Sequence, residues 1–81
     1  MDRKNVVGIR IREVRKAANY SQMRLAAEMQ LLGIKMDRTG IAKIESGRRP
    51  LLDIEIIAIS KILHTTIHEL FKDTDMQLGY R

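Results

Sequence analysis

Residues 21–50 read SQMRLAAEMQLLGIKMDRTGIAKIESGRRP, and they carry most of the structural information in the chain. Within this stretch, apolar residues at helical spacing occur twice, at Leu25 and Met29 and again at Ile41 and Ile44. Spacings of three and four residues place side chains on one face of a helix. The stretch therefore predicts two short helices in succession, each with one buried face.

The ends of both helices are marked by residues with a defined capping role. Ser21 and Asp37 each precede an apolar pattern, and both types are favoured N-caps because their side-chain oxygens accept from backbone N–H groups. Gly33 and Gly47 follow the patterns, as is typical of helix C-termini. We expect the helix that starts after Ser21 to extend through Leu32, and the helix that starts after Asp37 to run over 38–46.

Three more helices are predicted on either side of this pair. Residues 5–18 carry an apolar stripe, and residues 53–63 are so rich in isoleucine that more than one face is apolar. Thr66 and Glu69 have the capping-box spacing, which starts a last short helix ending near Phe71. β-strand patterns are poor, so the fold class is all-α, with one domain over residues 1–72 and a tail over 73–81.

Composition favours a binding module over an enzyme. The chain has 81 residues and no cysteine, so disulfides and thiolate metal sites are excluded. The formal net charge of +5 is uneven, because residues 1–50 hold twelve Lys/Arg against five Asp/Glu. Such asymmetry is typical of a surface that faces a polyanion. No apolar stretch approaches the ~20 residues of a membrane span, and we expect a cytoplasmic protein.

Four segments in fixed order carry a family resemblance: IREVRK at 11–16, SQMRLA at 21–26, RTGIAKIESGRRP at 38–50 and IHELF at 67–71. Together they resemble the phage-repressor/Cro-like helix-turn-helix family, also called the xenobiotic-response-element family. The resemblance covers roughly residues 7–71. It implies a five-helix, lambda-repressor-like DNA-binding domain that places its third helix in the major groove.

The resemblance implies that three residues of the third helix read bases. Arg38 and Thr39 occupy its first turn and Lys43 lies one turn later. An Arg or Lys can pair with the acceptors of guanine, and a Thr methyl can contact thymine. For Lys43, phosphate contact without base recognition is the main alternative.

Further residues are expected to contact the DNA backbone. Gln22, at the start of the second helix, would donate its amide to a phosphate or brace a recognition side chain. Arg48 and Arg49, in the segment after the third helix, and Arg10, in the first helix, would contact phosphates. The alternative for all four is a side chain that is only solvated.

The resemblance also implies a structural ion pair between Arg15 and Glu45, and the sequence departs from the family pattern in three ways. The connection before Ile41 is longer than the shortest family pattern. Gly40 lies inside the third helix, where a larger side chain is expected to clash with DNA or with the second helix. Leu52 stands where the family often has a Ser or Thr cap.

Other patterns carry less weight. His64 and His68 are four residues apart, but a helix break lies between them and no third ligand is evident, so no metal or cofactor is expected. His64 is expected at a helix C-terminal position usually filled by glycine. The methionines at 23, 29 and 36 are expected to fill the core. No motif for a catalytic site is present.

Three functional hypotheses remain. The first is a transcriptional regulator, in particular a repressor, that binds a pseudo-palindromic operator as a homodimer. The excess apolar surface of helix 53–63, together with Met76, Leu78 and Tyr80 in the tail, motivates the dimer. The second hypothesis is an antitoxin-type protein-interaction module that sequesters a partner protein. The third, a basic membrane-surface protein, is the weakest, because no single amphipathic helix carries the basic residues.

Overall fold

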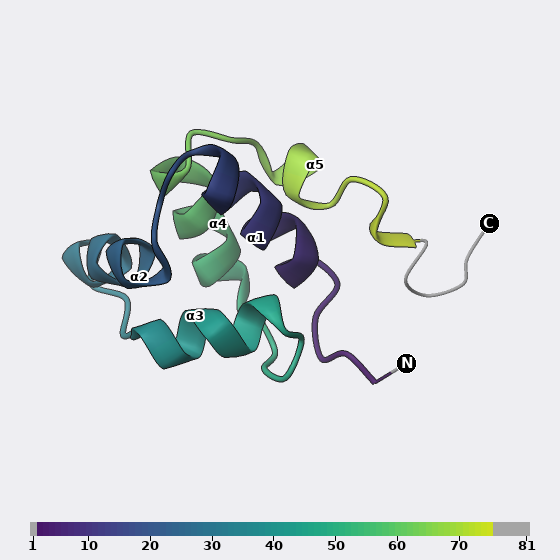
Figure 1. Cartoon of the computed structure of the whole chain (residues 1–81), viewed down its shortest axis with the longest axis horizontal. Coiled ribbons are helices and arrows are strands. Elements are labelled where there is room, and N and C mark those ends of the chain that lie inside the picture. The colour runs from purple at the N-terminus through teal and green to yellow at the C-terminus, as the bar shows by residue number, and fades with distance from the viewer. Residues whose placement is uncertain (1, 76–81) are drawn as a thin grey trace.

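The computed structural model describes residues 2–75, and it confirms an all-α fold with five helices in that range. The helices are α1 (Gly8–Ala17), α2 (Gln22–Leu31), α3 (Arg38–Glu45), α4 (Asp53–Ile62) and α5 (Ile67–Leu70). In Figure 1, α3 runs along the lower side of the molecule, α1 and α4 lie above it, α2 lies at the left, and α5 lies at the upper right. The apolar tail residues Met76, Leu78 and Tyr80 lie outside the described residues.

Local capping residues fix the start of three helices, as the sequence predicts. Ser21 Oγ accepts from the backbone N–H of Arg24 at 3.0 Å, and Asp37 Oδ1 accepts from that of Gly40 at 2.7 Å. Thr66 Oγ1 does the same at the start of α5. Each bond satisfies an N–H group that the first helical turn leaves without a partner.

The first helix begins three residues later than predicted, at Gly8 rather than Asn5. The side chain of Asn5 accepts from the backbone N–H of Gly8 at 2.7 Å, so Asn5 precedes the helix instead of forming part of it. The predicted apolar stripe is confirmed, since Val7 and Ile11 are buried and Val14 packs against the same core.

One core joins all five helices. It contains completely buried side chains from each of them: Ile11, Leu25, Met29, Ile41, Ile44, Ile59 and Leu70. The long α2–α3 connection contributes Met36, which is buried, and Ile34, which packs against the core. Burial of these apolar side chains is the main contribution to stability in a domain without disulfides.

Two predictions for apolar residues are wrong. Leu32 continues the spacing of Leu25 and Met29 and was expected on their buried face, but it is 57% exposed, because α2 ends at Leu31 and the chain turns at Gly33, whose φ is +82°. Met23 is 65% exposed, on the outer side of α2, whereas Met29 and Met36 are buried as expected. His64 has a φ of +54°, which confirms its glycine-like position after α4.

Candidate nucleic-acid interface

The two sides of α3 differ sharply. Ile41 and Ile44 are completely buried on the inner side. At 3.6 residues per turn, Thr39 and Lys43 lie on the opposite side, and Arg38 lies at its edge. All three side chains are exposed, and none has a bonding partner among residues 2–75. The predicted base-contacting residues therefore share an accessible surface, as the sequence analysis requires.

The inner side of α3 is fixed by a buried ion pair with α1. Arg15 donates to both carboxylate oxygens of Glu45, at 2.6 and 3.1 Å, and the two side chains are 9% and 3% exposed. Arg15 also donates to the carbonyl of Tyr20. The predicted structural pair is thus confirmed, and it sets the position of α3 relative to α1.

Gln22 belongs to this same network. Its side-chain Nε2 donates to Glu45 Oε1 at 3.1 Å, so it braces the ion pair from the first turn of α2. Beside it, a surface hollow on one flank of α3 is lined by Arg12, Gln22, Ala42 and Ser46 among others. Arg12 is exposed there and was missed by sequence analysis, which had no means of telling which arginines of α1 face α3.

The other flank of α3 carries a second hollow, which we call the basic hollow. Its lining includes Thr39, Lys43, Arg48, Arg49 and, from the N-terminal segment, Lys4. Arg48 is exposed and donates to Ser46 Oγ at 2.9 Å. Several cations thus lie beside the exposed side of α3, an arrangement that attracts a polyanion.

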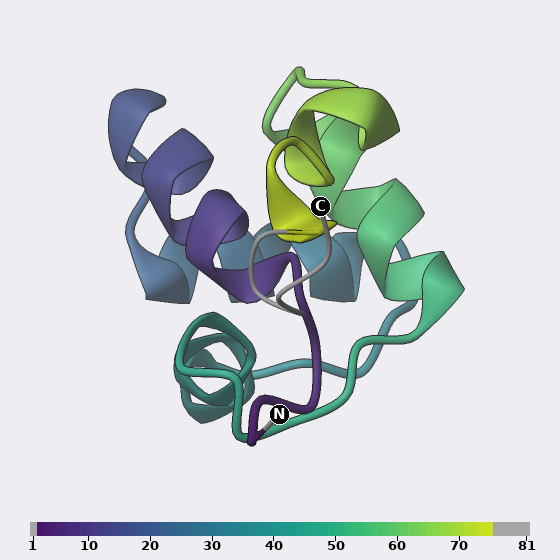
Figure 2. The same ribbon diagram turned by 90° about the vertical axis from the view of Figure 1, so that its right-hand side faces the viewer.

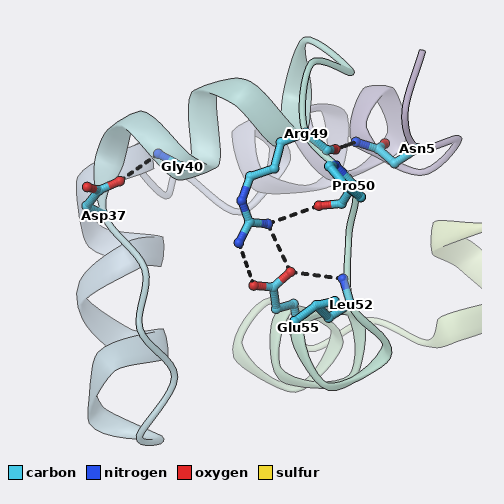
Figure 3. Close-up of polar contacts among 7 residues, drawn as sticks. All are labelled: Asn5, Asp37, Gly40, Arg49, Pro50, Leu52 and Glu55. Carbon is cyan, nitrogen blue, oxygen red and sulfur yellow. Dashed lines mark hydrogen bonds and ion pairs between the residues drawn. The ribbon is translucent and has the colours of Figure 1, made fainter. Parts of the chain in front are cut away.

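Arg49 is less available than Arg48. Its guanidinium donates to both oxygens of the Glu55 carboxylate, at 3.0 and 2.8 Å, and to the carbonyl of Pro50 (Figure 3). The side chain of Glu55 is only 3% exposed, and it also accepts from the backbone N–H of Leu52. This bond caps α4 where Leu52 itself has no acceptor. Arg49 therefore holds the start of α4, and its predicted phosphate contact remains a prediction.

The Arg49–Glu55 pair shifts the ionisation of both groups. Burial raises the pKa of the Glu55 carboxyl, but the hydrogen bonds from Arg49 and Leu52 outweigh this effect and hold the pKa below its ordinary value. The hydrogen bonds to Glu55 raise the pKa of Arg49. Both groups are charged at neutral pH.

Arg10 lies apart from α3. Its guanidinium donates to the Glu69 carboxylate at 2.9 Å and to the Glu69 backbone carbonyl at 3.1 Å, which ties α1 to α5. The sequence suggested a phosphate contact for Arg10. The structure gives it a fold-stabilising partner, no described contact brings it to the α3 surface, and its phosphate contact stays a prediction.

The presence of glycine at position 40 has a local structural reason. A Cβ atom there would lie 2.6 Å from Met36 Sδ and 3.2 Å from Asp37 Oδ1. The space is therefore limited by the connection before α3, and the expected clash with α2 is wrong. Met36 occupies this place because the long connection folds it into the core.

A comparison with protein-family models matches residues 11–70 to a helix-turn-helix family. The chain belongs to the helix-turn-helix family. The match spans all of α2, α3, α4 and α5 and most of α1, and it is of the Cro/C1 type, which confirms the resemblance to phage repressors. The family indicates a DNA-binding helix-turn-helix regulator, and α2 and α3 are the two short consecutive helices inside the matched region.

Searches among curated proteins and among solved structures gave no match. In the described part of the chain no helix is long and apolar enough to cross a membrane. Residues 2–75 also contain no cluster of three or more His, Asp or Glu side chains suited to a metal ion.

Proposed function

We propose that this helix-turn-helix protein is a sequence-specific transcriptional repressor that inserts α3 into the major groove of double-stranded DNA. The observation that carries the proposal is the exposed set Arg38, Thr39 and Lys43, on a helix whose other side is anchored by Ile41 and Ile44. A rigid helix with long polar side chains on one side fits the width of the major groove.

In this proposal, the exposed side of α3 contacts bases and its flanks contact phosphates. Arg38, Thr39 and Lys43 contact base edges. Arg48, and Gln22 on the opposite flank, contact phosphates, which position the helix without carrying sequence information. Gln22 can do so while bonded to Glu45, because a carboxamide nitrogen has two hydrogens to donate.

We further propose that the repressor acts as a homodimer on a pseudo-palindromic operator. Ile54 and Ile57, one turn apart on α4, are 56% and 49% exposed, and Leu52 beside them is 59% exposed. Apolar side chains grouped in this way are costly in water, and a second copy of the same face would cover them. Two recognition helices would then enter successive major grooves about 34 Å apart.

Selection of bound sequences from a random duplex pool tests this function. The expected result is an enriched motif with two related half-sites, bound by two protomers as judged from the mass of the complex. An enriched single half-site bound by one protomer would contradict the homodimer alone. A pool that shows no enrichment would contradict sequence-specific binding as well.

A reporter gene placed behind the selected motif tests the repressor role. Expression of the protein is expected to lower transcription from this promoter, and a scrambled motif serves as the control. Increased transcription would show activation instead.

A further inference from the structure

The N-terminal segment is fastened to the end of the recognition helix. Three successive residues, which we call the N-terminal strap (residues 3–5), bond to the backbone there. Arg3 Nη2 donates to the carbonyl of Glu45 at 3.1 Å, Lys4 N to that of Gly47 at 2.7 Å, and Asn5 Nδ2 to that of Ile44 at 2.9 Å. Figure 2 shows the strap descending from α1 to the loop that leaves α3. These bonds satisfy carbonyls at the end of α3.

The strap has little freedom to lie elsewhere. Asn5 Nδ2 also donates to the carbonyl of Arg49 at 2.8 Å (Figure 3), while its Oδ1 accepts from the N–H of Gly8. A Cβ atom at Gly8 would lie 2.1 Å from the carbonyl oxygen of Ile44, so only glycine permits this approach of α1 to α3. One carboxamide thus joins the start of α1, the end of α3 and the loop after it.

The side chain of Lys4 takes no part in this fastening. Only the backbone N–H of Lys4 bonds to α3, and its side chain is exposed, with no partner among residues 2–75. Lys4 is one of the residues that line the basic hollow, together with Thr39, Lys43 and Arg48. The strap therefore holds a cation beside the base-contacting residues while leaving its ammonium group available.

The charge of the basic hollow favours an anion despite one carboxylate. Asp37 also lines the hollow, but its Oδ1 accepts from the N–H of Gly40, and the Arg49 guanidinium attracts its charge. The same hollow is lined by three cationic residues, Lys4, Lys43 and Arg48. None of them has a carboxylate partner among the described residues, so they outnumber the charge of Asp37.

We propose that Lys4 contacts a backbone phosphate of the DNA duplex that α3 recognises, so that the N-terminal strap is part of the DNA interface. The proposal rests on the proposed DNA-binding function and adds a contact from outside the two helices of the helix-turn-helix. Because the strap is already fastened to α3, positioning Lys4 requires little additional loss of conformational freedom on binding.

The experiment compares the full chain with its Lys4→Ala and Lys4→Arg variants on the selected operator and on a random duplex. Binding is measured from about 50 to 200 mM salt. Lys4→Ala is expected to weaken binding to both duplexes alike and to reduce the slope of log K against log salt by about 0.9, the value for one lost phosphate contact. Lys4→Arg is expected to restore the slope. Lys61→Ala, on α4, is the matched control and should leave the slope unchanged.

Two further measurements separate the possible failures. Lys4→Ala should unfold at the same temperature as the unmodified chain, because its backbone makes the bond to Gly47; a clear drop would contradict the proposal by giving the side chain a structural role. Lys43→Ala and Arg48→Ala are tested in parallel. If both weaken binding while Lys4→Ala changes neither affinity nor slope, the Lys4 contact alone is overturned. If none of the three has an effect, the proposed function fails too.

Discussion

Charged side chains on the inner side of α3 are paired within the protein, whereas those on its outer side are not. On the inner side, Glu45 is buried and bonded to both Arg15 and Gln22. On the outer side, Arg38 and Lys43 are exposed and have no partner among residues 2–75. The inner charges fix the position of the helix, and the outer ones remain available for a ligand.

This difference extends to the remaining arginines. Arg10 and Arg49 each donate two or more hydrogen bonds that tie separate parts of the fold together, whereas the side chain of Arg48 bonds, within residues 2–75, only to the nearby Ser46. Arg10 and Arg49 are thus held by glutamates of the fold, whereas Arg48 has no carboxylate partner among residues 2–75 and is free to contact DNA under the proposed function. Substitutions on the two sides should consequently change different measured quantities.

The largest effect is expected at the buried pair. Arg15→Ala leaves the Glu45 carboxylate buried without its main partner, so the free energy of unfolding should fall by about 3–5 kcal/mol. Urea denaturation followed by circular dichroism measures this loss. Glu13→Ala, at an exposed position on the same helix, serves as the control. An equally stable Arg15→Ala variant would show that the pair does not position α3.

The second effect concerns Glu55 and its pH dependence. Glu55→Gln should lower the free energy of unfolding by about 1–3 kcal/mol at neutral pH, since Arg49 loses its charged acceptor. The pKa of Glu55 is lowered in the folded protein, so its contribution is complete above the ordinary glutamate pKa, roughly 4.3, and is lost as the pH falls through the lower folded value. Urea denaturation from neutral to acidic pH should therefore show the difference between variant and parent shrinking. A constant difference would contradict this account.

The third effect is on DNA recognition and leaves the fold intact. Arg38→Ala and Lys43→Ala should each reduce discrimination at particular base pairs by about 1–3 kcal/mol, with an unchanged unfolding temperature. Competition binding against operators with single base-pair changes measures this. Equal losses on operator and random DNA for Arg38→Ala would reduce that residue to a phosphate contact.

The smallest effects are expected at Asp37. Asp37→Ala removes the N-cap of α3 and should cost about 1 kcal/mol of stability, which thermal denaturation can detect. Asp37→Asn keeps an acceptor for the cap but removes a negative charge beside the basic hollow. It should therefore retain stability and bind all DNA sequences slightly more tightly. A destabilised Asp37→Asn variant with unchanged DNA affinity would contradict this separation.

Elements that depend on neighbouring residues can be predicted from the sequence. The caps at Ser21, Asp37 and Thr66 follow from bonds to a backbone group three residues away, so the residue types alone indicate them. The Arg15–Glu45 pair followed from the family resemblance. The exposed side of α3 followed from the spacing of its isoleucines.

The sequence could not predict which cations are bound by the fold itself. Arg10 and Glu69 are 59 positions apart, and Asn5 and Ile44 are 39 apart, so these bonds exist only once the helices have packed. For the same reason, the sequence did not indicate that Lys4 would lie beside Lys43. The predicted start of α1 was three residues too early. The Asn5 side chain bonds to the end of α3 and to the loop after it as well as to Gly8 of α1, and these distant bonds cannot be read from the sequence.

Mapping the backbone amide NMR shifts on addition of the selected duplex tests the central claim most directly. Our account predicts that the largest changes fall on residues 38–43, on the loop after α3 and on Lys4, with smaller ones at the start of α2. Changes centred on α4 and α5, with α3 unaffected, would contradict it.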